Sequence, residues 1–219
     1  MLSVVIPALN ASTTLPGAIA AVAAEAAEIV VADGSSTDAT AATAEALGAR
    51  VLRVARGRGG QLAAGIAAAR FPWLLLLHAD TRLGPGWVAC ARAHIDAGPA
   101  RAGYFRFALD SADPRARRLE RAVAWRCRVL ALPYGDQGLL IHRDLLAAVG
   151  GLRPLPLMED VDLVRRLGRT RLVSLDAVAL TSAARWERDG WRRRSLRNLG
   201  CLAAWFAGVP PGRIARFYQ

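Results

Sequence analysis

The sequence predicts an α/β fold in which helices flank a mostly parallel sheet. In the first third of the chain, short apolar runs alternate with alanine-rich stretches of helical periodicity, which is the pattern of successive strand–helix units. Two of these runs lead directly into an acid, at Asp33 and at Asp80. Because the carboxyl ends of parallel strands share one edge of a sheet, both carboxylates are expected where metal and phosphate sites usually lie.

Four strands are expected in this part, at residues 3–6, 28–32, 50–54 and 73–77, with helices between them at residues 12–24, 37–47 and 60–70. Ser12 and Thr37 are suitable N-cap residues, and Gly48 is a suitable helix terminator. Strand–helix units in series predict parallel pairing. We therefore expect residues 1–83 to form a nucleotide-binding half.

The alternation loosens after residue 84. A helix is expected at residues 87–97, an alternating strand at 103–109, an arginine-rich amphipathic helix at 114–132 and a further helix that begins at Glu159. Residues 190–206 predict a basic helix that carries Trp191, Trp205 and Phe206. Mixed strands and longer connections suggest that residues 84–219 form the acceptor side of a cleft. The chain shows no internal repeat or linker, so residues 1–219 are expected to be a single domain.

Composition limits the classes of partner. A chain of 219 residues with 53% hydrophobic composition suffices for one full core. The formal net charge is +11, but all 29 basic residues are arginine, a bias that partly resembles GC-rich codon usage. The charge is therefore a weak argument for nucleic acid, and no such partner is expected, although arginine still favours anionic substrates. The three cysteines have no CxxC spacing, which indicates neither a disulfide framework nor a zinc site.

The first residues have the pattern of a strand rather than of a signal peptide, and no apolar run reaches the roughly 18 residues of a spanning helix. We therefore expect a cytoplasmic protein. The basic, aromatic stretch at residues 190–206 suits a helix that lies on the inner face of a membrane. A helix packed against the domain with a solvated basic face is the alternative.

Five motifs occur in an order and spacing similar to those of family 2 glycosyltransferases, which have the GT-A fold. They are VVIPALN (residues 4–10), VADGSSTD (31–38), RGGQ (58–61), HAD (78–80) and MEDVDL (158–163). Together with GDQG (135–138) and SAARW (182–186), HAD resembles a compact bacterial subgroup labelled as glycosyltransferases of arsenosugar biosynthesis. The resemblance spans nearly the whole chain and implies a GT-A fold and sugar transfer from a nucleotide donor, UDP-linked by family habit.

The resemblance implies that Pro7, Ala8 and Asn10 border the nucleotide. It also implies that Asp33 accepts a hydrogen bond from the base and that Arg58 lies near the base or the diphosphate. The residue types fit, since a carboxylate accepts from a base N–H and a guanidinium donates to carbonyl or phosphate oxygens. The alternatives are a helix cap for Asp33 and a solvated surface arginine for Arg58.

Asp80 corresponds to the last acid of the family's DxD motif, which holds Mn²⁺ or Mg²⁺ against the diphosphate. In this chain His78 replaces the first acid, so we expect an altered metal preference and a hydrogen bond from His78 to the ribose. The resemblance places Ala79 beside the nucleotide as well. A histidine that only fills the strand end is the alternative.

Glu159 and Asp160 open an amphipathic helix, where the helix dipole is expected to lower the pKa of a carboxyl. The resemblance makes Asp160, or its neighbour Glu159, the general base that takes a proton from the acceptor hydroxyl, which gives inversion in one displacement. Two acids that only cap the helix are the alternative. Asp136 and Gln137 lie in a glycine-flanked turn and are expected to contact the acceptor or the donor sugar.

These observations predict an inverting, metal-dependent glycosyltransferase with a UDP-sugar donor. Two other classes stay open. One is an arginine-rich nucleic-acid or membrane-surface binding protein that keeps the fold without turnover. The other is a sugar nucleotidyltransferase, against which the absence of an early glycine-rich loop ending in lysine or arginine argues.

Overall fold

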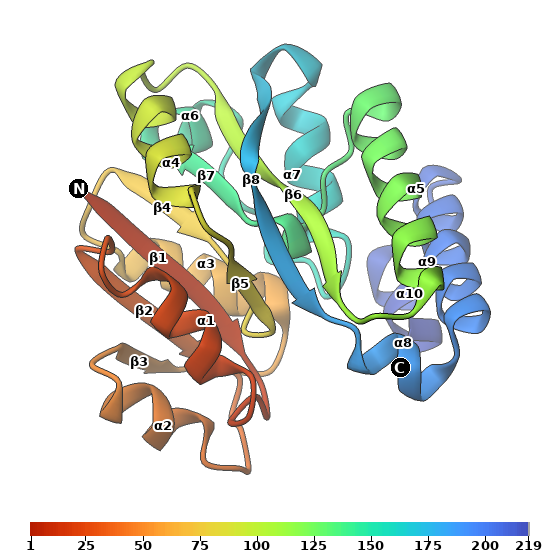
Figure 1. Cartoon of the computed structure of the whole chain (residues 1–219), viewed down its shortest axis with the longest axis horizontal. Coiled ribbons are helices and arrows are strands. Elements are labelled where there is room, and N and C mark those ends of the chain that lie inside the picture. The colour runs from red at the N-terminus through yellow and green to blue at the C-terminus, as the bar shows by residue number, and fades with distance from the viewer. Residues whose placement is uncertain (219) are drawn as a thin grey trace.

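The computed structural model describes residues 1–218. They form one eight-stranded mixed sheet with helices around it (Figure 1). Its strands are β1 (Leu2–Ala8), β2 (Glu28–Asp33), β3 (Arg50–Arg53), β4 (Trp73–Leu76), β5 (Thr81–Leu83), β6 (Ala102–Asp110), β7 (Leu139–His142) and β8 (Leu172–Ser182). They lie in the order β3-β2-β1-β4-β7-β6-β8-β5. The predicted α/β class is confirmed.

Helices flank this sheet. They are α1 (Leu15–Val22), α2 (Thr40–Ala46), α3 (Arg58–Ala68), α4 (Trp87–Asp96), α5 (Pro114–Leu130), α6 (Arg143–Ala148), α7 (Glu159–Leu167), α8 (Ala184–Asp189), α9 (Trp191–Phe206) and α10 (Pro211–Tyr218), with 3₁₀ turns η1 (Gly135–Gln137) and η2 (Arg169–Arg171). Within residues 1–218, no helix combines the length and the apolar character needed to cross a bilayer.

The first four strands pair as the sequence predicts. β1 pairs in parallel with β2 and with β4, and β2 pairs in parallel with β3. In this register Ala8 lies beside Asp33 at the carboxyl ends of β1 and β2. The acid-bearing turns that follow β2 and β4 therefore lie on either side of the end of β1.

The two predicted N-caps are wrong. Both α1 and α2 begin after the expected position, so neither Ser12 nor Thr37 caps a helix. Their backbone N–H groups bond across the two loops instead: Ser12 donates to Asp38 (3.1 Å) and Thr37 donates to Asn10 Oδ1 (2.9 Å). These bonds join residues far apart in the sequence and hold both segments non-helical. Gly48 follows α2 with φ of 79°, as a helix terminator does.

Three strands after β4 were not resolved by the sequence pattern: β5, β7 and β8. β7 runs antiparallel between β4 and β6, and β5 pairs antiparallel with β8. β5 and β7 have three and four residues, which is too short for a periodic pattern to be visible. β8 does alternate between buried and more exposed residues, so its signal was present and missed. The expected strand β6 and the helices α4, α5, α7 and α9 are confirmed within a few residues.

The central strands are buried on both faces, which explains their continuous apolar runs. Val4 and Ile6 of β1 pack with α1 and α4, whereas Val5 between them packs with α3, α6 and α7. Leu75 and Leu74 of β4 divide between the same two layers. The loops at the carboxyl ends of these strands thus rest on a rigid double-sided core.

The helices α5, α9 and α10 form a further layer beside β6 and β8, at the right of Figure 1. Trp186 and Trp191 pack with Val123 of α5, and Cys201 of α9 packs with Ile214 of α10 and with α7. This C-terminal layer supplies one wall of the cavity that contains the candidate site.

Candidate active site

A cavity of about 100 Å³ lies where the ends of α3, β4 and α7 meet the C-terminal layer. On the sheet side its wall includes five residues singled out from the sequence: Arg58, His78, Asp80, Asp136 and Asp160. The opposite wall includes Trp186, Arg194, Asn198, Cys201 and Tyr218. The fold therefore gathers predicted site residues from most of the chain around one space.

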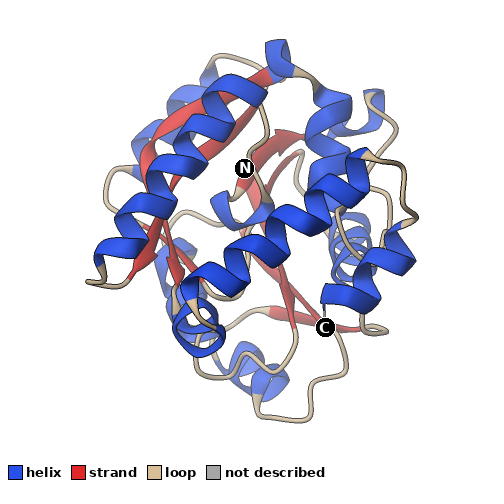
Figure 2. Cartoon of the chain, turned by 90° about the vertical axis from the view of Figure 1, so that its right-hand side faces the viewer, coloured by secondary structure: helices blue, strands red, loops and turns tan. Residues whose placement is uncertain are grey.

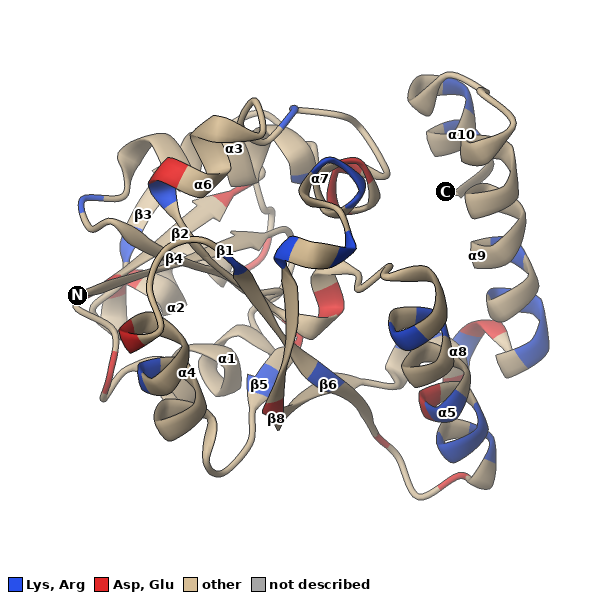
Figure 3. Cartoon of the chain, turned by 90° about the horizontal axis from the view of Figure 1, so that it is seen from above, with Lys and Arg blue, Asp and Glu red and all other residues tan. Residues whose placement is uncertain are grey.

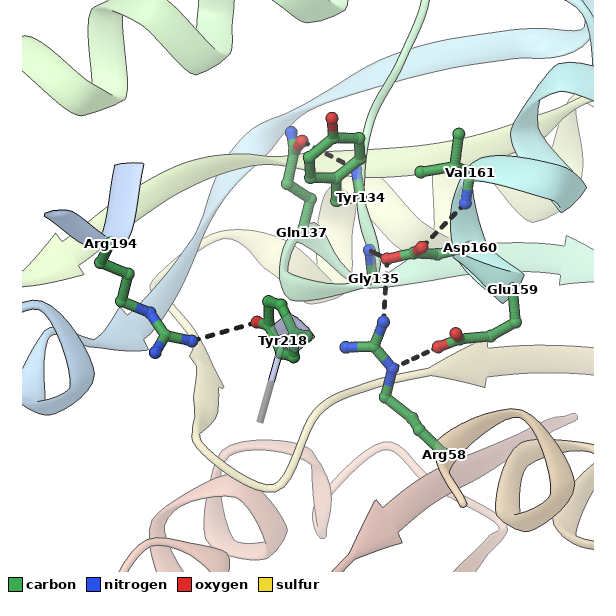
Figure 4. A network of polar contacts seen from close by, with 9 residues as sticks. All are labelled: Arg58, Tyr134, Gly135, Gln137, Glu159, Asp160, Val161, Arg194 and Tyr218. Atoms are coloured by element: carbon green, nitrogen blue, oxygen red, sulfur yellow. Dashed lines mark hydrogen bonds and ion pairs between the residues drawn. The ribbon is translucent and has the colours of Figure 1, made fainter. Parts of the chain in front are cut away.

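Arg58, the first residue of α3, joins the two acids that open α7 (Figure 4). Its Nε donates to Glu159 Oε1, and its Nη2 lies 3.5 Å from Asp160 Oδ2. Asp160 also accepts the backbone N–H of Gly135 (2.9 Å) and of Val161 (2.8 Å). Arg58 is thus engaged with two acids and is not a freely solvated arginine.

The two acids have pKa values shifted in opposite directions. Burial alone would raise the pKa of Asp160, but the charge of Arg58 and the Gly135 amide outweigh it and hold that pKa below its usual value. The side chain of Glu159 is only 1% exposed, and burial raises its pKa in spite of Arg58. The expectation that the helix N-terminus lowers the pKa of either acid is wrong for Glu159, because desolvation dominates there. Asp160 therefore presents an ionised carboxylate to the cavity.

His78 and Asp80 follow β4 and line the cavity, whereas Ala79 between them packs into the core. His78 Nε2 is buried and has no hydrogen-bond partner among residues 1–218. Burial, together with the charge of Arg58, lowers the pKa of His78 to about 4, so the imidazole is neutral at pH 7. The Asp80 carboxylate lies 3.6 Å from Arg185 Nη2. His78 thus brings a ring nitrogen to the cavity that no group among residues 1–218 occupies.

The two residues expected to contact a sugar, Asp136 and Gln137, both lie in the turn η1 but have different surroundings. Asp136 lines the cavity, and burial raises its pKa to about 6 against the attraction of Arg126. Gln137 is 2% exposed; its side chain donates to Phe105 O (3.0 Å) and accepts from Tyr134 N–H (3.2 Å). Gln137 thus holds the turn against β6, and Asp136 is the member of the pair that faces the cavity.

The residues expected at the nucleoside lie together at the ends of β1 and β2. Pro7 and Ala8 are register neighbours of residues 32 and 33, and Asn10 follows with φ of 48°. Asp33 is 3% exposed and accepts the Ser36 N–H (3.1 Å), which fixes the turn after β2 rather than capping a helix. These residues share the sheet edge with the cavity, although in the described part of the chain the cavity wall does not include them.

Gln61 of the RGGQ motif ties this edge together. Its side-chain amide, which is buried, donates to Ala8 O (2.7 Å) and to Ala32 O (2.8 Å). One glutamine thus bridges the ends of β1 and β2, and α3 is fixed against both strands just beyond Arg58.

The cavity wall also includes residues that were not singled out from the sequence, among them Tyr134, Arg185, Arg194 and Tyr218. Burial raises the pKa of Tyr134 to about 12, so its hydroxyl stays protonated, and Arg194 Nη2 donates to Tyr218 OH (3.1 Å). Tyr134 directly precedes GDQG and Arg185 lies within SAARW, so both motifs carried a signal. Arg194 and Tyr218 reach the cavity only because α9 and α10 pack across it (Figure 4).

The side chains near Asp80 fit a hard divalent cation that is shared with a ligand. Within residues 1–218, no group of three or more His, Cys, Asp or Glu side chains is arranged to hold a metal ion. Asp80 contributes a carboxylate, and beside it His78 Nε2 is an unpartnered nitrogen. Mn²⁺ and Mg²⁺ in diphosphate sites commonly use only one or two protein carboxylates. The Asp80 carboxylate therefore suits a hard divalent ion when diphosphate oxygens complete the coordination.

In a comparison with known protein families, the family described as glycosyl transferase family 2 matches residues 3–151. Comparison with curated proteins gives no match. A solved structure of a mycobacterial protein is 25% identical to this chain, with a TM-score of 0.58. The match covers 83% of this chain but only 65% of the mycobacterial protein.

Glucosyl-3-phosphoglycerate synthase from Mycobacterium tuberculosis, solved with Mn²⁺ and UDP-glucose, is 22% identical with a TM-score of 0.58, covering 83% of this chain and 69% of its own. The same synthase with Mn²⁺, UDP and glucosyl-3-phosphoglycerate is 23% identical with a TM-score of 0.56, covering 83% and 70%. These likenesses are of fold, and the chain spans about two thirds of the length of the structures it resembles.

Proposed function

Because the chain belongs to glycosyltransferase family 2, we propose that it is an inverting enzyme that transfers a sugar from a UDP-linked donor to an acceptor hydroxyl. The GT-A fold expected from the motifs agrees with the mixed sheet and its parallel half. Within that fold, residues 1–83 are proposed to bind the donor and residues 84–219 to bind the acceptor.

One observation carries the proposal: Asp160 presents a fixed, ionised carboxylate to the cavity. The acceptor oxygen attacks the anomeric carbon while the bond from that carbon to the diphosphate oxygen breaks, and the hydroxyl proton passes to Asp160. A single displacement of this kind inverts the configuration at the anomeric carbon. Glu159 is the weaker candidate for the base, because it is buried behind the cavity wall and bonded to Arg58.

The diphosphate is proposed to lie between the turn after β4 and the C-terminal layer. Arg58 and Arg185 offer guanidinium groups there, and His78 offers an unpaired ring nitrogen. A Mn²⁺ or Mg²⁺ ion at Asp80 would neutralise charge on the departing UDP. The synthase of similar fold was solved with Mn²⁺ and UDP-glucose, which supports both the cation and the uridine donor.

Membership of the compact subgroup labelled for arsenosugar biosynthesis is a finer proposal. It is supported by the cavity wall, to which each of the three motifs contributes one residue: His78 from HAD, Asp136 from GDQG and Arg185 from SAARW. The acceptor that such an enzyme would use is a hydroxyl compound small enough to enter beside Tyr134 and Tyr218.

Nucleotide binding and turnover test the proposal separately. Thermal shifts with UDP, GDP and TDP, each with and without Mn²⁺, should show stabilisation by UDP that needs the metal. Asp80→Asn should lose this metal-dependent stabilisation. Asp160→Asn should keep it, while release of UDP from a UDP-sugar falls by about 10²–10⁴-fold, the usual contribution of a general base.

Asp110→Asn is the matched control, because that carboxylate is 58% exposed on β6 and lies outside the cavity wall. The absence of any nucleotide-dependent shift in the parent protein would overturn the donor proposal. Unchanged turnover in Asp160→Asn, with loss in Glu159→Gln, would move the base by one residue.

A further inference from the structure

Exposed apolar side chains are concentrated on one surface. Of the nine large hydrophobic side chains that are exposed within residues 1–218, seven lie on α5, α9 and α10: Trp125, Val129, Leu130, Leu196, Leu199, Phe206 and Phe217. Figure 2 shows these helices side by side on the face turned to the viewer. We call this face the three-helix surface.

The outward side of α9 is apolar where a surface helix is normally charged. Leu196 and Leu199 are 68% and 61% exposed, and helical spacing places Phe206 on the same side. The opposite side of α9 is buried and contributes Arg194 and Cys201 to the cavity wall. The helix thus has one side that the protein buries and an opposite, apolar side that it leaves exposed.

Unpaired positive charge surrounds these apolar side chains. α9 and α10 contain no acid, and the single acid of α5, Glu120, is bonded to Arg117 (Figure 3). On α5, α9 and α10, the exposed arginines for which residues 1–218 provide no acidic partner are Arg118, Arg121, Arg128, Arg192, Arg193, Arg213 and Arg216. The surface is therefore both apolar and strongly cationic.

We propose that the three-helix surface binds an anionic lipid bilayer, with the helices lying flat on it. Leucine, phenylalanine and tryptophan side chains enter the headgroup boundary, and the arginines contact lipid phosphates. A second copy of the chain fits poorly, because two such surfaces would repel each other. Since the inner side of α9 lines the cavity, this contact holds the cavity next to the lipid surface. The proposal goes beyond sugar transfer and does not depend on it.

Sedimentation with vesicles tests the proposal without donor or acceptor. The full chain should bind phosphatidylcholine vesicles that contain phosphatidylglycerol, bind pure phosphatidylcholine far less, and dissociate as salt rises. Neutralising one arginine near an anionic surface typically weakens binding about fivefold, so Arg192→Gln with Arg193→Gln should weaken it by about one order of magnitude or more. Leu196→Asp with Leu199→Asp should abolish it.

The matched control is Leu47→Asp, an exposed leucine after α2 that is away from the three-helix surface. It should bind vesicles as the parent does, and UDP-dependent thermal shifts should be the same in all these variants. The proposal would be overturned if vesicle binding did not depend on phosphatidylglycerol, or if the leucine variants bound vesicles as the parent does. A third result would also overturn it: duplex DNA releases the protein from the vesicles, and the leucine substitutions have no effect on vesicle binding. That result would identify a nucleic-acid surface instead.

Discussion

At the scale of single residues, the cavity acids differ in what stabilises their charge. Asp160 has two backbone amides and Arg58, whereas Asp136 Oδ1 is buried without a partner in the described part of the chain. Burial raises the pKa of Asp136 to about 6, above the ordinary 3.8 of an unfolded chain. Between these two values the unfolded chain has released its proton and the folded chain has not, so the free energy of unfolding falls as pH rises. Above pH 6 this acid destabilises the fold.

Asp136→Asn should therefore stabilise the protein above pH 6 and slow its turnover. The gain in free energy of unfolding should be about 0.5 kcal/mol at pH 4 and grow to at most about 3 kcal/mol at pH 7.5, which corresponds to the shift of the pKa. Denaturant unfolding at several pH values measures it.

Asp176→Asn provides the control for this series, because its side chain is 91% exposed. A gain of equal size and pH dependence in Asp176→Asn would show that burial at Asp136 is not the cause. A gain in Asp136→Asn that is the same at pH 4 and pH 7.5 would contradict the argument in the same way.

At the scale of elements, α3 connects the donor edge to the catalytic helix. Its first residue, Arg58, bonds to Glu159 of α7, and Gln61 bridges the ends of β1 and β2. Between them, Gly59 lies directly against the backbone of the segment that leads to α7: an added Cβ would meet Leu155 N at 2.7 Å, closer than a Cβ atom tolerates. The absence of a side chain at position 59 therefore sets the distance between α3 and α7.

Gly59→Ala and Gly60→Ala should act in opposite directions, although both place alanine in the same helical turn. An added Cβ at position 60 meets nothing within 4 Å, so helix propensity should raise the free energy of unfolding by about 1 kcal/mol. At position 59 the clash with backbone should lower it by about 1–3 kcal/mol and displace Asp160, with loss of turnover. Thermal unfolding and UDP release measure both effects. Equal stability of the two variants would show that the backbone around Leu155 moves to accept the added Cβ without loss of stability.

At the scale of the whole molecule, the two halves share one sheet. β7 from the second half lies between β4 and β6, and β5 from the first half pairs with β8. Leu140 of β7 is completely buried and belongs to the same core layer as Val4 and Leu75. Each half thus pairs strands with the other, and we predict on that basis that the two halves unfold together.

Unfolding in denaturant should therefore be one cooperative transition. Far-ultraviolet circular dichroism and tryptophan fluorescence should give the same midpoint, because tryptophans lie both in β4 and in the C-terminal layer. Leu140→Ala should move both midpoints together, with a loss of about 2–5 kcal/mol. Separate transitions, or a Leu140→Ala effect on one signal alone, would show that the halves unfold independently.

Local pattern was sufficient for much of the fold and for part of the site. Apolar runs predicted the strands β1 to β4 and their parallel pairing, and helical periodicity predicted α3 and α7. These signals come from neighbouring residues, so a single sequence contains them. The five motifs indicated the family, and Arg58, His78, Asp80, Asp136 and Asp160 all line the cavity.

Only the tertiary structure decided how those residues act on one another. The place of β7, the bonds of Arg58 to acids about a hundred residues away, and the closing of the cavity by Tyr218 depend on packing between distant segments. The opposite pKa shifts of Glu159 and Asp160, which are adjacent in the sequence, follow from burial and from bonding partners. Burial is a property of the assembled molecule, so it has no signature in a run of neighbouring residues.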